Sequence, residues 1–335
     1  MSKDFAFYFL MILILILLIP SYLFQGAVDI HWRDILKISS DSSLNANLWA
    51  TQVFWEVRFP RLILAMLCGS GLAIAGAMVQ GVFRNPLVEP GLIGITSGAA
   101  LFASFAIVFL ENSIQALFLL QGISFLGAVT VSLLVYFISS KDGKVSVITL
   151  LLMGIGINAS VGAIMGLLHY LASDTQLRAI SFWGMGSLSL ASWDIILSIF
   201  PFSFLLYFSI PFFSGGLNAF MLGENEANHL GYNTDKLKIS LLIVVCLSVG
   251  AFVSITGIIG FIGLVVPHIV RIWGRANHQF LLPASGVLGA ILLIASDALA
   301  RILVSPSELP IGILTAGIGS PLFLYILSKQ IKQSL

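Results

Sequence analysis

Long apolar segments separated by short polar ones run along almost the whole chain. Dividing them at prolines, glycines and clusters of charge gives about ten segments, at residues 5–24, 61–83, 92–110, 114–138, 145–172, 195–213, 239–256, 258–273, 281–303 and 311–328. Backbone amides that face lipid must be hydrogen-bonded within their own segment, and an α-helix of this length satisfies them. The pattern therefore predicts an all-α polytopic membrane protein with about ten transmembrane helices.

No polar loop separates the seventh and eighth segments. As one helix, residues 239–273 would be roughly 50 Å long, which exceeds a hydrocarbon core of about 30 Å. Thr256, Gly257 and Gly260 are residues that favour a reversal of the chain. We therefore expect two short helices in this region.

The composition supports a membrane protein and excludes several other classes. Of the 335 residues, 58% are hydrophobic and 9% are charged, whereas about a quarter are charged in soluble domains. A net charge of +1 without a basic run argues against a nucleic-acid partner. Cys68 and Cys246 lie in apolar segments without ligand spacing, so we expect packing residues rather than a disulfide or metal site.

The distribution of lysine and arginine predicts the orientation. With the N-terminus inside, ten of the 16 lie on the cytoplasmic side: Lys3, Arg84, Lys141, Lys144, Lys236, Lys238, Arg271, Arg275, Lys329 and Lys332. The outer side keeps the other six: Arg33, Lys37, Arg58, Arg61, Arg178 and Arg301. An even number of spans then places both termini in the cytoplasm.

Two connections are long enough to form structure of their own. Residues 173–194 are expected on the outer face. Residues 214–238 are expected in the cytoplasm, where 221–231 has a short helical pattern with early acidic residues and a glycine stop. We see no soluble domain, so residues 1–335 are interpreted as a single transmembrane domain with a cytoplasmic segment at about 214–238.

Six motifs occur in order along the chain: RFPR at 58–61, GAMVQG at 76–81, NPLVEPGLIG at 85–94, LGENEANHLG at 222–231, GFIGLVVPHIVR at 260–271 and ELPIG at 308–312. As a set they resemble the signature of the FecCD family of ABC permeases, whose members import iron siderophores, haem and cobalamin. The resemblance extends from about residue 50 to the C-terminus. It implies the type II ABC importer permease fold, with ten helices in each subunit of a homodimer that encloses one path.

The resemblance also implies the partners. Two cytoplasmic ATPase subunits would bind ATP and Mg²⁺, and a periplasmic or lipid-anchored binding protein would deliver the substrate. The chain lacks a GxxxxGK[ST] phosphate loop, so we expect a transport subunit of the inner membrane with no catalytic residues, intrinsic cofactor or metal of its own. The expected cargo is haem or a ferric siderophore, with cobalamin as the alternative.

Several residues are candidates for these contacts by resemblance. Docking of the binding protein is assigned to Arg58, Arg61 and Arg301, although snorkelling or an internal pair such as Arg301 with Asp297 is also compatible with the sequence. Coupling to the ATPase is assigned to Leu222, Gly223, Glu224, Ala227, Leu230 and Gly231, with a solvated loop as the alternative. The translocation path is placed along 145–172 and 311–328, with Ser146, Asn158, Ser160, His169, Thr315 and Ser320, and the inner gate near 141–147.

Three residues of the eighth segment are interpreted mainly as helix framework. Pro267 frees a backbone carbonyl that nearby polar groups can satisfy, and His268 and Arg271 follow it. His169 is read as an interfacial residue in preference to a haem ligand. A secondary transporter is the rival from another class, but it would normally carry charges in mid-span, where this chain has Asp297 and Glu89 as the nearest exceptions.

Overall fold

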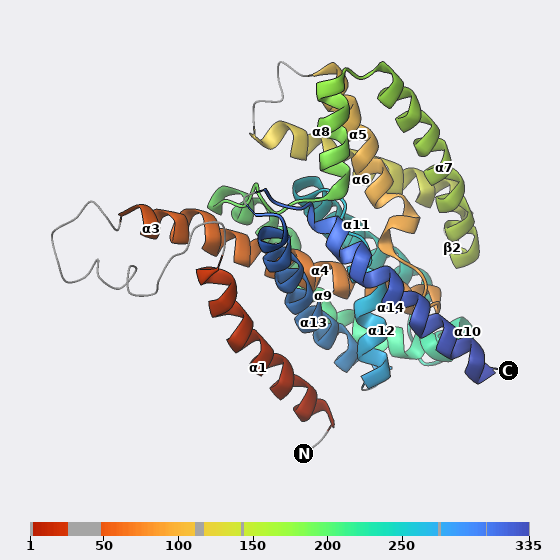
Figure 1. The fold of residues 1–335 in the computed structure, drawn as a ribbon. Helices are drawn as coiled ribbons and strands as arrows, with labels where there is room; N and C mark the ends of the chain where they lie inside the picture. Colours follow the sequence, from red (N-terminus) through yellow and green to blue (C-terminus); the bar gives the residue numbers. More distant parts are fainter. Residues whose placement is uncertain are drawn as a thin grey trace.

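The computed structural model describes residues 3–25, 48–110, 117–141, 144–273, 276–305 and 307–334 (Figure 1). Arg33, Lys37 and Arg275, which were used to predict the orientation, lie outside the described residues, as does the start of the expected segment 114–138. Within the described part, the fold is all helical apart from one two-stranded hairpin.

The elements follow the chain in this order: α1 (Lys3–Phe24), α3 (Leu48–Gln52), η2 (Val53–Arg58), α4 (Phe59–Phe83), η3 (Pro90–Ile93), α5 (Ile95–Phe109), α6 (Leu117–Ser139), β1 (Ser140–Lys141), β2 (Lys144–Val145), α7 (Val147–Leu171), α8 (Asp174–Met185), α9 (Trp193–Leu222), α10 (Glu224–His229), α11 (Thr234–Thr256), α12 (Ile262–Trp273), α13 (His278–Leu303) and α14 (Ile311–Ser334). The strands β1 and β2 pair antiparallel, with Ser140 opposite Val145.

The expected membrane helices are present in the described part of the chain. Seven helices are long and apolar enough to cross a bilayer, and three shorter apolar helices, α5, α12 and α14, bring the total to ten. Each of the ten corresponds to one expected segment. Contacts of α1 fix its direction beside α13: Phe7 packs on Phe280 near one end, and Tyr22 bonds to Asp297 near the other.

The predicted break between the seventh and eighth segments is confirmed. Helix α11 ends at Thr256 and α12 begins at Ile262. Gly257 has a φ of 68°, and a Cβ atom there would lie 2.1 Å from the carbonyl oxygen of Trp183. Only glycine fits this combination of left-handed backbone and close approach.

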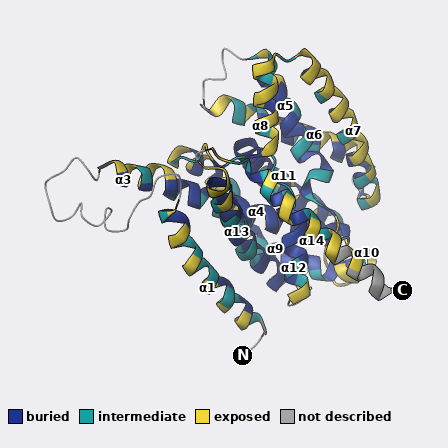
Figure 2. Cartoon of the chain, in the orientation of Figure 1, coloured by how far each residue is buried: buried dark blue, intermediate teal, exposed yellow. Residues whose placement is uncertain are grey.

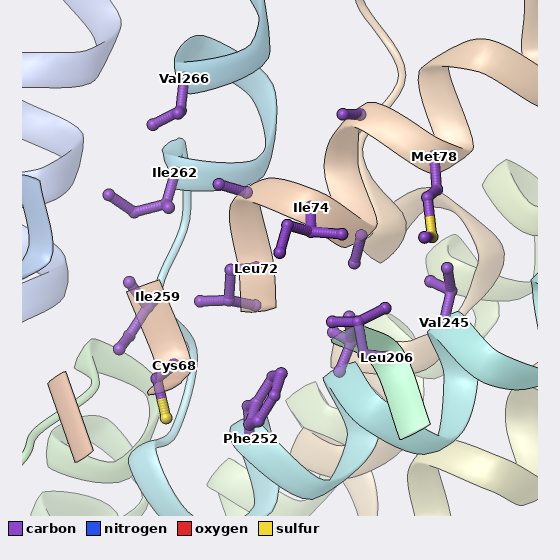
Figure 3. Packing of buried hydrophobic residues seen from close by; sticks show 14 of the residues in the cluster. Cys68, Leu72, Ile74, Met78, Leu206, Val245, Phe252, Ile259, Ile262 and Val266 are labelled. Atoms are coloured by element: carbon purple, nitrogen blue, oxygen red, sulfur yellow. The ribbon is translucent and has the colours of Figure 1, made fainter. Parts of the chain in front are cut away.

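The core is built around α4, which packs against α9, α11, α12 and α13 (Figure 2). Small residues allow the close approach: a Cβ atom on Gly76 would lie 1.9 Å from the Gly263 carbonyl oxygen of α12, and one on Gly69 would lie 2.5 Å from the Gly289 carbonyl oxygen of α13. Such contacts between backbones are the usual basis of helix association in lipid. Figure 3 shows apolar side chains from four helices gathered in this core: Cys68, Leu72, Ile74 and Met78 of α4, Leu206 of α9, Val245 and Phe252 of α11, and Ile262 and Val266 of α12.

Helices occupy both ends of the segment 214–238, which was expected in the cytoplasm. Helix α9 continues to Leu222, and α11 already begins at Thr234. The glycine pair at 215–216 does not end α9. The missing side chains leave room for neighbouring residues to pack against the helix, since a Cβ atom on Gly216 would lie 2.8 Å from Leu237. The connection between the helices is therefore limited to 223–233, and α10 occupies its first half.

Candidate functional site

Helix α10 forms a short projection between two glycines. Gly223 and Gly231 both have positive φ, at 135° and 90°, so the chain turns sharply before and after α10. Ala227 is buried against Phe220, and the flanking Leu222 and Leu230 are more than 60% exposed. An element that is anchored on one face and has exposed leucines at both ends is suited to docking on another protein.

A buried lysine joins α10 to two neighbouring elements. The ammonium group of Lys238, on α11, lies 2.5 Å from Glu224 Oε1, 3.1 Å from Asp235 Oδ1 and 3.0 Å from the carbonyl oxygen of Val145 on β2. The sequence analysis counted Lys238 only as a cytoplasmic charge. Its signal was a lysine one turn into an apolar helix, at a position whose neighbours 241, 242 and 245 are core residues.

A cleft of about 870 Å³ opens beside this junction. Its walls are the end of α4, the hairpin, the first turn of α7, α10 and the start of α11, with Arg84, Ser146, Asn225 and Asn228 among the polar residues that line it. The part of the expected inner gate at 144–147 thus lies next to the expected coupling element, whereas residues 142 and 143 lie outside the described residues. These two regions are about 80 residues apart in the sequence.

The expected path residues of α7 have different surroundings. Ser146 caps α7 by accepting a hydrogen bond from the Thr149 amide, and it is exposed. Ser160 is also exposed and donates to the carbonyl of its own helix at Gly156. Asn158 instead fastens α7 to its neighbours, because it accepts a hydrogen bond from Ser97 and donates one to the Gly91 carbonyl.

The remaining path candidates also include both exposed and buried residues. His169 is exposed near the end of α7, and Ser320 is half-buried on α14. Thr315 is buried and donates to the Gly312 carbonyl, and it faces a small apolar cavity between α12, α13 and α14. The side of α14 that carries Thr315 packs against the bundle in the single chain, and the assignment of Thr315 to the path stays a prediction.

A network of buried charges lies at the opposite end of the bundle, which is the expected outer side. The guanidinium group of Arg61 makes two hydrogen bonds to Asp297, at 2.8 and 3.0 Å, and two to Glu308, both at 2.9 Å. Asp297 also accepts a hydrogen bond of 2.6 Å from Tyr22. Paired charges of this kind compensate each other for the loss of water.

The three arginines expected at the docking surface all make internal contacts. Arg58 donates to the Leu23 carbonyl, and Arg301 donates to the Tyr22 carbonyl and stacks on the Tyr22 ring. Arg301 also lies 3.6 Å from Asp297, which is the internal pair considered as the alternative. Because the three residues are only 4–7% exposed, docking through their guanidinium groups would require them to leave these partners. The docking role stays a prediction.

The start of α14 is held at an outer junction, which we define as residues 183–187, 256–258 and 308–312. Gly186 accepts a hydrogen bond from the Ile311 amide, and the Thr256 carbonyl accepts one from Ser187. A Cβ atom on Gly312 would lie 2.3 Å from the Met185 carbonyl oxygen. The break after α11, the end of α8 and the ELPIG motif therefore meet backbone to backbone.

Helix α12 contains the three residues that were expected to act as helix framework. Pro267 cannot donate to the carbonyl of Gly263, and the side-chain amide of Gln80 on α4 donates to the Gly263 and Leu264 carbonyls instead. The other end of the Gln80 amide accepts a hydrogen bond from Arg271. His268 is buried beside this arrangement. Sequence reasoning included Gln80 in the GAMVQG motif but assigned it no role, although a glutamine inside an apolar helix is itself a signal.

No group of three or more His, Cys, Asp or Glu side chains suited to a metal ion occurs among the residues that the structure describes. In the same residues Cys68 and Cys246 are free thiols, with Cys68 fully buried in the core.

Known proteins resemble this chain over most of its length. It is 40% identical over 331 residues to the hemin transport system permease protein HmuU of Yersinia pestis, covering 97% of this chain and 96% of that protein. It is 34% identical to the vitamin B12 import system permease protein BtuC of Vibrio cholerae, with 83% of each chain covered. The iron(3+)-hydroxamate import system permease protein FhuG of Bacillus subtilis is also 34% identical, over 83% of this chain and 84% of that protein.

A solved structure described as an inward-facing conformation of a metal-chelate type ABC transporter superposes with a TM-score of 0.83 at 34% identity, covering 96% of this chain and 98% of that chain. The model of the FecCD transport family matches residues 11–329. The membrane helices and these relatives make the chain a multi-pass inner-membrane protein with the type II importer fold. The chain therefore belongs to the FecCD transport family, and it is the membrane-spanning permease of an ATP-binding-cassette importer.

Proposed function

We propose that this permease imports haem from the periplasm to the cytoplasm, as a homodimer driven by two separate ATPase subunits and supplied by a periplasmic or lipid-anchored binding protein. Ferric siderophores and cobalamin are the next candidates, since relatives named for hydroxamate and vitamin B12 import are less similar than the one named for hemin. ATP and Mg²⁺ belong to the ATPase in this proposal, and both termini of the permease lie in the cytoplasm.

Helix α10 is the observation that carries the proposed coupling to an ATPase. It combines exposed leucines at its ends, an acidic first turn and a firm attachment to the bundle through Glu224 and Lys238. A rigid projection transmits force as a body, whereas a loop attached only at its ends would bend. The ATPase would bind α10, and closure of the two ATPase subunits would tilt α9 and α11, against which α10 packs.

The exposed face of α7 supports the homodimer with a central path. Gly156, Gly162 and Gly166 have no neighbouring atom within 4 Å of an added Cβ, and most of α7 is exposed in the single chain (Figure 2). Weakly polar groups such as Ser160 lie on the same helix. A second copy facing α7 would enclose a wide, weakly polar conduit, which suits a bulky ligand that another protein delivers.

Replacing Glu224 with lysine tests the coupling role. The change places two like charges together at the base of α10, and we expect haem uptake to fall at least tenfold while the ATPase still hydrolyses ATP. ATP hydrolysis and uptake of haem would be measured on the same proteoliposomes. Glu226→Lys, at an exposed position in the same turn, is the matched control for the added charge. Wild-type uptake by Glu224→Lys would contradict the coupling role of α10.

A further inference from the structure

Lys238 has a full set of acceptors drawn from three separate elements. Its ammonium group has three protons, and its three acceptors are Glu224 on α10, Asp235 on the first turn of α11, and the carbonyl of Val145 on β2. The residue is 2% exposed, so these oxygens replace water almost completely. A buried ammonium is costly unless its partners are well placed, which ties the positions of the three elements to one another.

The contact with Val145 gives this junction a direct connection to a path helix. Val145 directly precedes Ser146, whose hydroxyl accepts a hydrogen bond from the Thr149 amide and thereby caps α7. A displacement of β2 therefore moves the first turn of α7. The hairpin packs on α11 and the end of α6, and its contact with α10 runs through Lys238.

We propose that Lys238 is a positioning residue that links α10 to the β1–β2 hairpin, so that movement of α10 shifts the cytoplasmic end of α7. This rests on the proposed function, in which an ATPase moves α10. When α10 tilts, Glu224 pulls on the ammonium group, and the ammonium group pulls on the Val145 carbonyl. The inner mouth of the path thus responds to the ATPase without a direct contact between them.

Other elements are less able to provide this link. Asn228 reaches Thr234 on α11, and Thr234 also donates to Glu224, but neither hydrogen bond extends to the hairpin. The cleft of about 870 Å³ separates the rest of α10 from the first turn of α7. Among the described residues, Lys238 donates hydrogen bonds to both α10 and β2 and so joins them directly.

The test uses the complete transporter, with its ATPase and binding protein, in lipid nanodiscs. A cysteine at Ile148 reports on the first turn of α7, because that side chain is 74% exposed and borders the cleft. Its rate of reaction with a fluorescent maleimide is measured without nucleotide and after trapping with ATP and vanadate. Labelling of the parent protein, which has Cys68 and Cys246, is subtracted.

Four permeases are compared in this assay: wild type, Lys238→Met, Lys238→Arg and Lys236→Met. Lys236 lies on the same turn of α11 with an exposed side chain, so Lys236→Met makes the same chemical change without touching the junction. We expect trapping to change the labelling rate several-fold in the wild type and in Lys236→Met. Lys238→Met should lose this difference while it still binds the ATPase and hydrolyses ATP, and Lys238→Arg should recover most of it.

The outcomes separate this inference from the proposed function. If Lys238→Met responds to trapping as Lys236→Met does, or if it loses the ATPase altogether, the linking role is wrong and α10 remains the coupling element. If the wild-type permease binds no ATPase, the proposed function itself fails. Should Lys238→Met not fold, Glu224→Gln breaks the same link from the half-exposed side, and an unchanged response in that variant overturns the inference.

Discussion

At the scale of single residues, the buried arginines make internal contacts of which the sequence offered only one. The RFPR motif placed Arg58 and Arg61 at an outer helix end, and Arg301 was considered near the same surface. The sequence offered the pair of Arg301 with Asp297, because four residues on a helix bring two side chains together. It did not offer the contacts of Arg61 with Asp297 and Glu308, which are 236 and 247 residues away.

Replacing Asp297 with asparagine should destabilise the permease. Two guanidinium groups would keep their buried sites without the carboxylate between them, and breaking a buried pair costs about 3–5 kcal/mol. We expect a lower melting temperature in detergent, measured by size-exclusion chromatography after heating. Asp194→Asn, at an exposed position in the first turn of α9, is the matched control. Equal melting of the two variants would show that the network does not brace the fold.

A second residue-scale prediction concerns Gln80. Replacing it with leucine leaves the Gly263 and Leu264 carbonyls and the Arg271 guanidinium without their side-chain partner, at about 1–3 kcal/mol for each buried group. We expect a clear fall in melting temperature, with Gln279→Leu at an exposed site unchanged. A normal melting temperature for Gln80→Leu would mean that water or a rearranged α12 satisfies these groups.

At the scale of elements, local signals in the sequence were reliable where glycine and proline decide the backbone. The reversal at Gly257 was predictable. It was also predictable that a backbone carbonyl of α12 needs another hydrogen-bond donor, because Pro267 has no N–H group. The continuation of α9 to Leu222 was not, because the sequence does not show that the glycines at 215–216 are protected by Tyr232 and Leu237. Helix α8, within the expected outer connection, was also not predicted.

The crossing of α4 and α12 gives a sharp prediction at this scale. Gly76→Ala would place a methyl group 1.9 Å from a backbone oxygen, so the two helices must separate. We expect a large loss of folded protein on expression and a lower melting temperature in what remains. A Cβ atom on Gly122 of α6 would have no neighbouring atom within 4 Å. Alanine favours helix by about 1 kcal/mol over glycine, so Gly122→Ala should be neutral or stabilising. Similar behaviour of the two variants would refute the close crossing.

At the scale of the whole molecule, the ten-helix arrangement followed from the apolar pattern and the thickness of a bilayer. The role as an importer permease rested on six motifs in order, and the family match over residues 11–329 confirms it. The meeting of α10 with the hairpin could not be predicted, because it depends on how α6, α9 and α11 end relative to one another in space. Charge and periodicity describe each helix alone and do not reveal such a junction.

The most direct test of the account is uptake of haem into proteoliposomes that contain the permease, its ATPase and its binding protein. We expect haem uptake to require ATP on the side of the membrane where α10 lies. Uptake should stop when the ATPase is omitted. Ferric hydroxamate and cobalamin are measured in parallel, and transport of either in place of haem would change only the substrate. Uptake of haem that persists without the ATPase, or no uptake of any of the three, would contradict the central claim.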